Sequence, residues 1–448
     1  MVFQKTRNWL IKKGENKKSP LFLLILGYFV MTLLCFITIW FPFSKNVEIS
    51  LIDQFFLATS IVSTTGLSPI NFGESLTLFG EISSILFIQL GGIGYMALSS
   101  FIILKDSPKL PKLSASLLRL EFHLPERYPL LSFIYSVFIF TVLIEIIGAI
   151  FLYWGFKDAG VDQPIWSAIF HSISAFCTAG FSLYGDSLSS FHSHPMITNT
   201  VIILSVLGSI GFIVLLDFWM RLRGKRKKVT LTSKIILIST FAYIFIGGIL
   251  LFFSDGVLFE QGLEGLKSAF FQLISAHTTV GFNNYPMENF KMGGLLILIL
   301  VMVIGASPAG TGGGIKTTSI TAIIGLVYSI LKQKSHITFF NRELPAKKIY
   351  HAVSSSVFYF FILMLGTWII IQIDGDRFSF EQLLFESASA LSTVGLSTGI
   401  TADLSSTNKI IISFLMFIGR LGVMTFGFAL ISKSPEMRSK PKIEDIAI

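Results

Sequence analysis

The sequence has 448 residues, of which 52% are hydrophobic and 14% are charged, and its formal net charge is +9. An ordinary soluble domain carries about 25% charged residues, so this composition excludes a soluble protein and indicates an integral membrane protein. The two cysteines, Cys35 and Cys177, both lie in apolar runs, which excludes a disulfide framework and a thiolate metal site.

The chain begins with a basic segment, residues 1–20, which we expect to be a cytoplasmic N-terminus. The apolar run that follows, Leu21–Phe43, has the length of about 20 residues that a membrane span needs. No small-residue cleavage site lies near its end, so the sequence predicts a retained first helix and not a signal peptide.

The rest of the chain repeats one order of elements four times. Each repeat has a long apolar helix, a short apolar stretch, a Thr-x-Gly segment and a second long apolar run. The predicted pore repeats are 21–105, 128–220, 234–331 and 347–431, and residues 432–448 form a predicted cytoplasmic tail. The second long runs are Leu76–Leu104, Ile197–Met220, Leu295–Leu331 and Ile410–Ile431.

The short apolar stretch of each repeat cannot cross a membrane. A helix rises about 1.5 Å per residue, so about 12 residues do not span a hydrocarbon core about 30 Å thick. We therefore expect four re-entrant pore helices, and hence an all-α integral membrane fold of four membrane helix–re-entrant pore loop–membrane helix repeats around one pore. The predicted pore helices are Ile52–Ser63, Pro164–Cys177, Leu263–His277 and Phe380–Ser392.

Each pore helix is followed by a Thr-x-Gly segment, and the four glycines lie 114, 101 and 114 residues apart. Four copies of an extended segment can form a ring of backbone carbonyls, which bind a dehydrated monovalent cation without a formal charge. Glycine permits the backbone angles that turn a carbonyl inward, and threonine adds a hydroxyl oxygen. The predicted cation-binding residues of this selectivity filter are Thr64, Thr65 and Gly66; Thr178, Ala179 and Gly180; Thr279, Val280 and Gly281; and Thr393, Val394 and Gly395.

The second long run of the third repeat contains the glycine-rich segment Gly305–Gly314, which cannot hold a regular helix. We expect a flexible gate across the pore; the alternative is a passive kink. Ile315 precedes Lys316 and no strand precedes the segment, so it is not a nucleotide-binding Walker A loop. The predicted gating residues here are Gly305, Ser307, Pro308, Gly310, Gly312, Gly313, Gly314 and Lys316.

Arg420 lies in the middle of the last apolar run, where an arginine costs about 2.5–3.5 kcal/mol. We expect it to face the pore and take part in gating. A charge about 10 Å from a cation, at an effective dielectric constant near 20, repels it by about 1.7 kcal/mol. The alternative is a structural ion pair with a carboxylate such as Glu81, Glu145 or Asp217.

Most of the 35 Lys and Arg residues fall in the two termini and in the links between repeats. Because basic residues favour the cytoplasmic side, we expect both termini inside the cell and a multi-pass protein of the cell membrane. The basic face can meet anionic membrane lipids. No feature of the sequence indicates nucleic-acid binding.

These motifs in this order resemble the Trk/Ktr/HKT superfamily of potassium transporters, and the compact chain is most similar to its KtrB-type membrane subunits. The resemblance rests on the four Thr-x-Gly segments, on Gly305–Gly314 and on Phe417-Ile418-Gly419-Arg420. It implies a homodimer with one pore per protomer and a cytoplasmic ring of KtrA-type subunits that carries the regulatory nucleotide. It also implies that glycine at position 66 favours potassium over sodium.

We therefore expect a gated potassium uptake protein that is not an enzyme, holds no organic cofactor and carries potassium as its transported ion. One alternative is a sodium-permeable or sodium-stimulated transporter of the same fold. A distant alternative is an intramembrane enzyme, because Gly305-Ala306-Ser307 contains the Gly-x-Ser pattern of rhomboid-type proteases. Pro308 stands where that pattern requires glycine.

Overall fold

The structure is a computed structural model that describes residues 20–106, 110–122, 124, 129–224, 228–334 and 336–430. These residues form a bundle of helices. The described chain also contains one small antiparallel hairpin, formed by β1 (Thr338–Phe339) and β2 (Arg342–Glu343). The predicted all-α class is confirmed. The predicted cytoplasmic ends lie outside the described residues, apart from Pro20.

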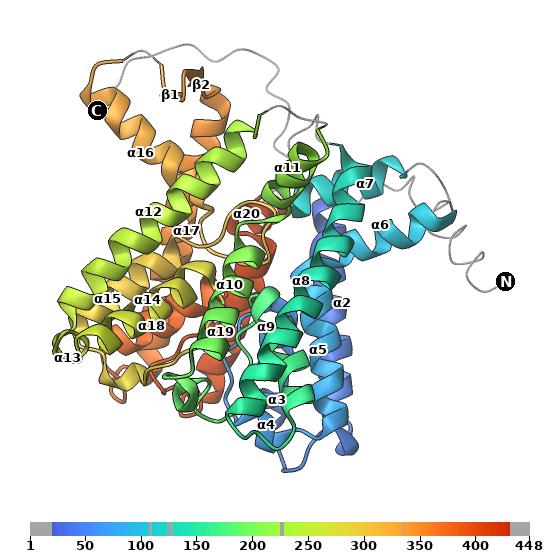
Figure 1. Ribbon diagram of the computed structural model, residues 1–448, viewed down its shortest axis with the longest axis vertical. Coiled ribbons are helices and arrows are strands. Elements are labelled where there is room, and N and C mark those ends of the chain that lie inside the picture. The colour runs from blue at the N-terminus through green and yellow to red at the C-terminus, as the bar shows by residue number, and fades with distance from the viewer. Residues whose placement is uncertain are drawn as a thin grey trace.

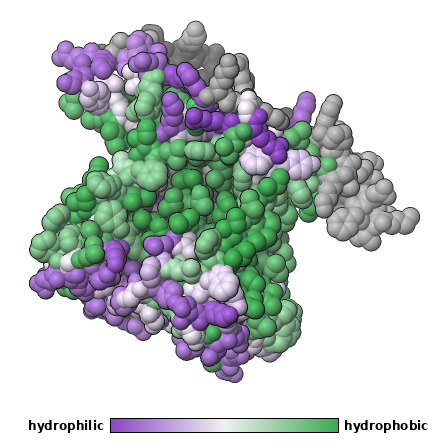
Figure 2. Space-filling view, in the orientation of Figure 1, coloured by the Kyte–Doolittle hydropathy of each residue, from purple (hydrophilic) through white to green (hydrophobic). Residues whose placement is uncertain are grey.

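The first helix of each repeat is long and apolar enough to cross a membrane. Large apolar side chains such as Ile139, Phe245 and Trp368 are exposed on these helices. Figure 2 shows an apolar belt between two polar ends of the molecule, as expected for a surface that faces lipid. The four helices are α2 (Pro20–Trp40), α8 (Leu130–Asp158), α12 (Leu231–Ser254) and α17 (Ala346–Asp374).

Four short helices lie inside the bundle where the sequence predicts pore helices. Ser50 caps the first of them by accepting a hydrogen bond from the Asp53 N–H, and Ser379 forms a capping box with Gln382 at the start of the fourth. Each ends within a residue of its predicted end. The helices are α3 (Leu51–Ser63), α9 (Pro164–Phe176), α14 (Leu263–Thr278) and α18 (Phe380–Leu391).

The second apolar run is interrupted in every repeat, whereas the sequence predicts a break only in the third. The two halves meet at 83° in the first repeat and at 91° in the second. The pairs are α5 (Leu78–Ile93) with α6 (Tyr95–Asp106), α10 (Pro195–Ser209) with α11 (Phe212–Leu222), α15 (Met292–Val303) with α16 (Thr317–Leu331), and α19 (Ser406–Leu421) with α20 (Val423–Leu430).

Single glycines make the breaks in repeats one, two and four. Gly94, Gly211 and Gly422 have φ of +86°, +87° and +83°, a region that other residues rarely adopt. Each follows another glycine three residues earlier, but a glycine within an apolar run costs a helix only about 1 kcal/mol, so this spacing alone does not fix the position of a break. Tertiary packing decides it, because a side chain on Gly211 would lie 2.6 Å from the carbonyl oxygen of Pro308.

Helix α7 (Lys112–Glu121) connects the first two repeats and packs against α2 and α6. Figure 1 shows α6 and α7 at the same end of the molecule as β1 and β2. The remaining short elements are α4 (Phe72–Ser75), α13 (Gly256–Glu260), η1 (Pro42–Ser44), η2 (Ser189–Phe191) and η3 (Met287–Asn289).

An ion pair ties the fourth repeat to the first. Lys409 on α19 donates to Asp53 on α3 at 2.7 Å, and both side chains are largely buried. The two residues are 356 positions apart in the chain. The first and last repeats are therefore neighbours, as a closed arrangement of four repeats requires.

Candidate functional site

The four Thr-x-Gly segments adopt the same backbone conformation. In each, the threonine has φ between +51° and +60° and the glycine has φ between +66° and +97°. The N–H of the middle residue donates a hydrogen bond to the carbonyl of the residue five positions earlier, in the pore helix. Thr65 N–H, for example, donates to Ser60 O at 2.9 Å. A positive φ is uncommon for threonine, so the surrounding structure holds these turns in place.

The four segments form a closed ring, because each glycine packs against the segment of the next repeat. A Cβ atom added to any of the four would lie 2.0–2.5 Å from the carbonyl oxygen of the middle residue in the next repeat. Since the fourth repeat meets the first, the four middle carbonyls surround one axis. The pairs are Gly66 with Ala179, Gly180 with Val280, Gly281 with Val394, and Gly395 with Thr65.

This ring has the chemistry of a site for a monovalent cation. Backbone carbonyl oxygens carry partial negative charge and can replace water around the ion. The pore helices end directly before the segments, so the partially negative C-terminal ends of their dipoles are directed at the ring. The hydroxyl oxygen of Thr393 is buried and has no hydrogen-bond partner within the described residues, which leaves it free to act as a ligand.

The glycine-rich segment of the third repeat is a folded loop between α15 and α16. Its backbone bonds to the break of the second repeat: Ser307 N–H donates to Ser209 O at 3.0 Å, and Phe212 N–H donates to Ala309 O at 2.9 Å. Ser307 and Ala309 are buried. The loop is therefore a defined structure that the second repeat supports.

The same loop lies against the threonines of the ring. The hydroxyls of Thr311 and Thr178 are 3.0 Å apart, and Gly313 N–H donates to the Thr279 hydroxyl at 3.2 Å. A Cβ atom on Gly313 would lie 2.3 Å from the Thr393 hydroxyl. Three of the four threonines thus meet the loop directly, and only glycine fits between the loop and the last of them.

Arg420 contacts the remaining threonine of the ring, Thr64. Its guanidinium donates to the Thr64 hydroxyl at 3.0 Å and also to the carbonyls of Thr311, Gly91 and Gly92. The hydrogen bonds of Arg420 thus go to neutral oxygens of the ring, the loop and the end of α5, and its charge also acts on the Glu121 carboxylate across a cavity that both residues line.

The three carboxylates considered as partners of Arg420 bind elsewhere. Glu81 accepts a hydrogen bond from Trp166, and Glu145 accepts from Gln89. Asp217 accepts from Thr230 and Ser233. The hydrogen bonds of Arg420 therefore go to none of these three carboxylates.

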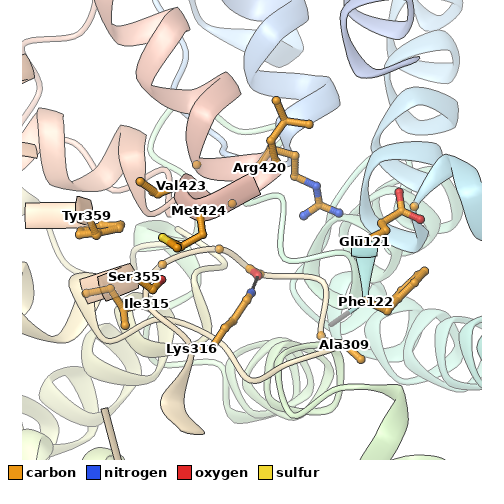
Figure 3. A pocket seen from close by; sticks show the side chains of 18 of the residues that line it. Glu121, Phe122, Ala309, Ile315, Lys316, Ser355, Tyr359, Arg420, Val423 and Met424 are labelled. Carbon is orange, nitrogen blue, oxygen red and sulfur yellow. Dashed lines mark hydrogen bonds between the residues drawn. The ribbon is translucent and has the colours of Figure 1, made fainter. Parts of the chain in front are cut away.

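A cavity of about 90 Å³ lies on the other side of the loop, and Figure 3 shows its lining. Lys316 extends along the loop and donates to the Gly312 carbonyl at 2.7 Å. Arg420 and Glu121 enter from other elements (Figure 3). The cavity holds room for water molecules, each of which needs about 10–15 Å³, so it can form the inner part of a polar pathway.

Glu121 is a residue of this region that the sequence analysis missed. It lies at the end of α7, outside the candidate spans, and accepts a hydrogen bond from Tyr28 at 3.1 Å. Burial raises the pKa of Glu121 to about 7. No local pattern identifies this glutamate, since it ends an ordinary amphipathic helix.

A serine lies six residues before each glycine of the ring and is not among the predicted site residues. A signal was present, because aligning the four segments on their glycines places serine at this position every time. These residues are Ser60, Ser174, Ser275 and Ser389.

Comparison with known proteins gives a consistent result. The model of the family described as TrkH, cation transport protein, matches residues 51–241 and 259–440. The Ktr system potassium uptake protein B of Vibrio alginolyticus is 30% identical over 96% of this chain and 95% of its own length. The protein of the same description from Bacillus subtilis (strain 168) is 31% identical over 92% and 93%.

Two further relatives extend the comparison. The potassium/sodium uptake protein NtpJ of Enterococcus hirae is 31% identical over 98% of this chain and 99% of its own length. The crystal structure of the potassium transporter TrkH from Vibrio parahaemolyticus superposes with a TM-score of 0.74, covering 93% of this chain and 86% of that chain at 18% identity. The structural match shows a shared fold.

Proposed function

This chain belongs to the TrkH family of cation transport proteins, and we propose that it takes up potassium across the cell membrane as the ion-translocating subunit of a gated system. It is a transport protein and not an enzyme, which sets aside the intramembrane enzyme. In keeping with this, the Ser307 hydroxyl is engaged with the Thr317 hydroxyl at 3.0 Å.

The observation that carries the proposal is the closed ring of Thr-x-Gly segments. Each glycine packs against the middle carbonyl of the next repeat, so the ring forms only if all four repeats are present. Its carbonyls supply the uncharged oxygens that a dehydrated potassium ion requires. We assign the twelve residues of the four segments as the potassium site, with the threonines at the inner end.

Gating is assigned to the loop Gly305–Gly314 together with Arg420 and Lys316. The loop and Arg420 occupy the space next to all four threonines, so an ion that leaves the ring meets either a backbone segment or a positive charge. Conduction requires the loop to move or its contacts to loosen. The alternative role as a passive kink predicts that loosening the loop does not raise flux.

We assign the end of the molecule that carries α7 and the β1–β2 hairpin to the cytoplasm, with both chain termini on that side. Lys112, Arg119, Lys334 and Arg342 lie on these elements or next to them, and basic residues favour the cytoplasmic side. The names of the Ktr relatives indicate a multisubunit system. The proposed partners are a second copy of this chain and a cytoplasmic ring of KtrA-type subunits with bound nucleotide.

Potassium-dependent growth and rubidium uptake in a host without its own potassium uptake systems test the proposal. We expect uptake that requires this chain and that changes when a KtrA-type subunit is also present. Purified protein in lipid vesicles should take up rubidium down an imposed gradient, whereas empty vesicles should not. Absence of rubidium uptake by correctly folded protein would overturn the proposal.

A sodium-permeable or sodium-stimulated transporter remains a second candidate, because the Enterococcus hirae relative is described as a potassium/sodium uptake protein. The same vesicles separate the two candidates. A potassium transporter continues to take up rubidium when sodium is in excess, whereas a sodium-permeable one shows inhibition by sodium and takes up sodium itself.

A further inference from the structure

We infer that the serine six residues before each ring glycine positions the backbone of the ring, and that Ser60 and Ser389 hold the carbonyls of Thr65 and Val394 toward its axis. This assigns a role in ion selectivity to side chains that never contact the ion. The inference rests on the proposed function of the Thr-x-Gly segments as the potassium site.

The serines of repeats one and four act as hydrogen-bond acceptors. Gly66 N–H donates to the Ser60 hydroxyl oxygen at 3.1 Å, and Gly395 N–H donates to the Ser389 hydroxyl oxygen at 3.0 Å. Both serines are fully buried in their pore helices. The N–H groups of Gly66 and Gly395 are therefore directed outward, each into the pore helix behind it.

Planarity of the peptide bond carries this constraint to the ring. In a trans peptide the N–H and the preceding C=O point in opposite directions. When the Gly395 N–H is held outward by Ser389, the Val394 carbonyl must point to the opposite side. That carbonyl oxygen is the one that lies beside Gly281 in the ring, and Thr65 O has the equivalent place beside Gly395.

The serines of repeats two and three act as donors. The Ser174 hydroxyl donates to Phe181 O at 2.9 Å, and the Ser275 hydroxyl donates to Phe282 O at 2.6 Å. These carbonyls follow the ring glycine and are turned back toward the pore helix. The same residue type thus anchors the segment at two different peptide bonds.

The two kinds of anchor divide the ring into two sides. Repeats one and four are neighbours, which the Asp53–Lys409 ion pair also joins, and they share the acceptor serines. Repeats two and three share the donor serines. We therefore expect the carbonyls of Thr65 and Val394 to depend on a serine hydroxyl more directly than the other two ring carbonyls do.

The test compares Ser389→Ala with Ser387→Ala in vesicles. Ser387 is on the same pore helix and equally buried, but its hydroxyl donates to Leu383 O within the helix and not to the ring. The readout is the ratio of rubidium to sodium uptake. One buried hydrogen bond corresponds to about a fivefold change, so we expect about a fivefold lower ratio for Ser389→Ala and an unchanged ratio for Ser387→Ala.

Ser389→Thr retains the hydroxyl and should restore most of the ratio. Equal ratios for Ser389→Ala and Ser387→Ala, or equal loss in Ser389→Ala and Ser389→Thr, would overturn the inference while the intact protein remains selective. If Ser389→Ala does not fold, Ser389→Cys provides the test, because sulfur is only a weak acceptor; an unchanged ratio then overturns the inference. Failure of the intact protein to take up rubidium would instead overturn the proposed function and this inference with it.

Discussion

Gly180→Ala tests the ring directly. Gly180 has φ of +66°, and a Cβ atom added there would lie 2.0 Å from the carbonyl oxygen of Val280. Real Cβ contacts are essentially never shorter than 3.0 Å, so the carbonyl must move by about 1 Å, whereas functional groups tolerate displacements of about 0.5 Å. We expect the variant to lose ion discrimination.

The magnitude follows from the two costs of the substitution. A left-handed backbone costs alanine about 1–2 kcal/mol, and forcing a methyl group into a packed site costs about 1–3 kcal/mol more. Only the second cost distorts the ring. If the free-energy preference of the ring for potassium over sodium falls by this second cost, the potassium-to-sodium uptake ratio falls by about fivefold to about 150-fold.

Gly160→Ala is the matched control. Gly160 lies in the same repeat with φ of +72°, but nothing lies within 4 Å of its added Cβ atom. It should lose about 1–2 kcal/mol of stability and retain the uptake ratio. Competition between rubidium and sodium in vesicles measures both variants, with thermal unfolding as the check on folding. Equal ratios for Gly180→Ala and the intact protein would refute the ring as the site of discrimination.

Four further changes, at the ring, at Arg420, in the loop and at the Asp53–Lys409 ion pair, give additional expectations. Gly66→Ser should also lower the potassium-to-sodium ratio, and an unchanged flux ratio would show that the assignment is wrong at this position. Arg420→Gln should raise cation flux with little change in selectivity; a variant that fails to insert until a carboxylate is also neutralised would indicate a structural ion pair. Deletion of Ala309–Gly313 should raise rubidium flux without a regulatory subunit, and flux at or below that of the intact protein would remove the gating role. Lys409→Met should cost about 1.5–3 kcal/mol, the value of a hydrogen bond to a charged group, because the Asp53 carboxylate loses Lys409 but keeps the Ser50 hydroxyl, and Asp53→Asn in the same chain should recover part of that loss in thermal unfolding.

The sequence by itself determined the membrane class, the four repeats and the positions of the Thr-x-Gly segments. These are local or periodic properties: a run such as Leu21–Phe43 is long enough to span a bilayer, and a run such as Ile52–Ser63 is not. The ends of the pore helices were also predictable within a residue. The apolar runs set the length of each helix, and the following Thr-x-Gly segment marks its end.

Only the tertiary structure decided how these parts meet. The sequence does not show that Gly180 packs against Val280, that Arg420 bonds to Thr64, or that Gly94 breaks its helix. Each of these depends on atoms from repeats or links far apart in the chain. The local sequence around a single glycine, serine or arginine does not show which atoms surround it in the folded protein. Its role depends on the oxygen and nitrogen atoms that the neighbouring repeat places close to it.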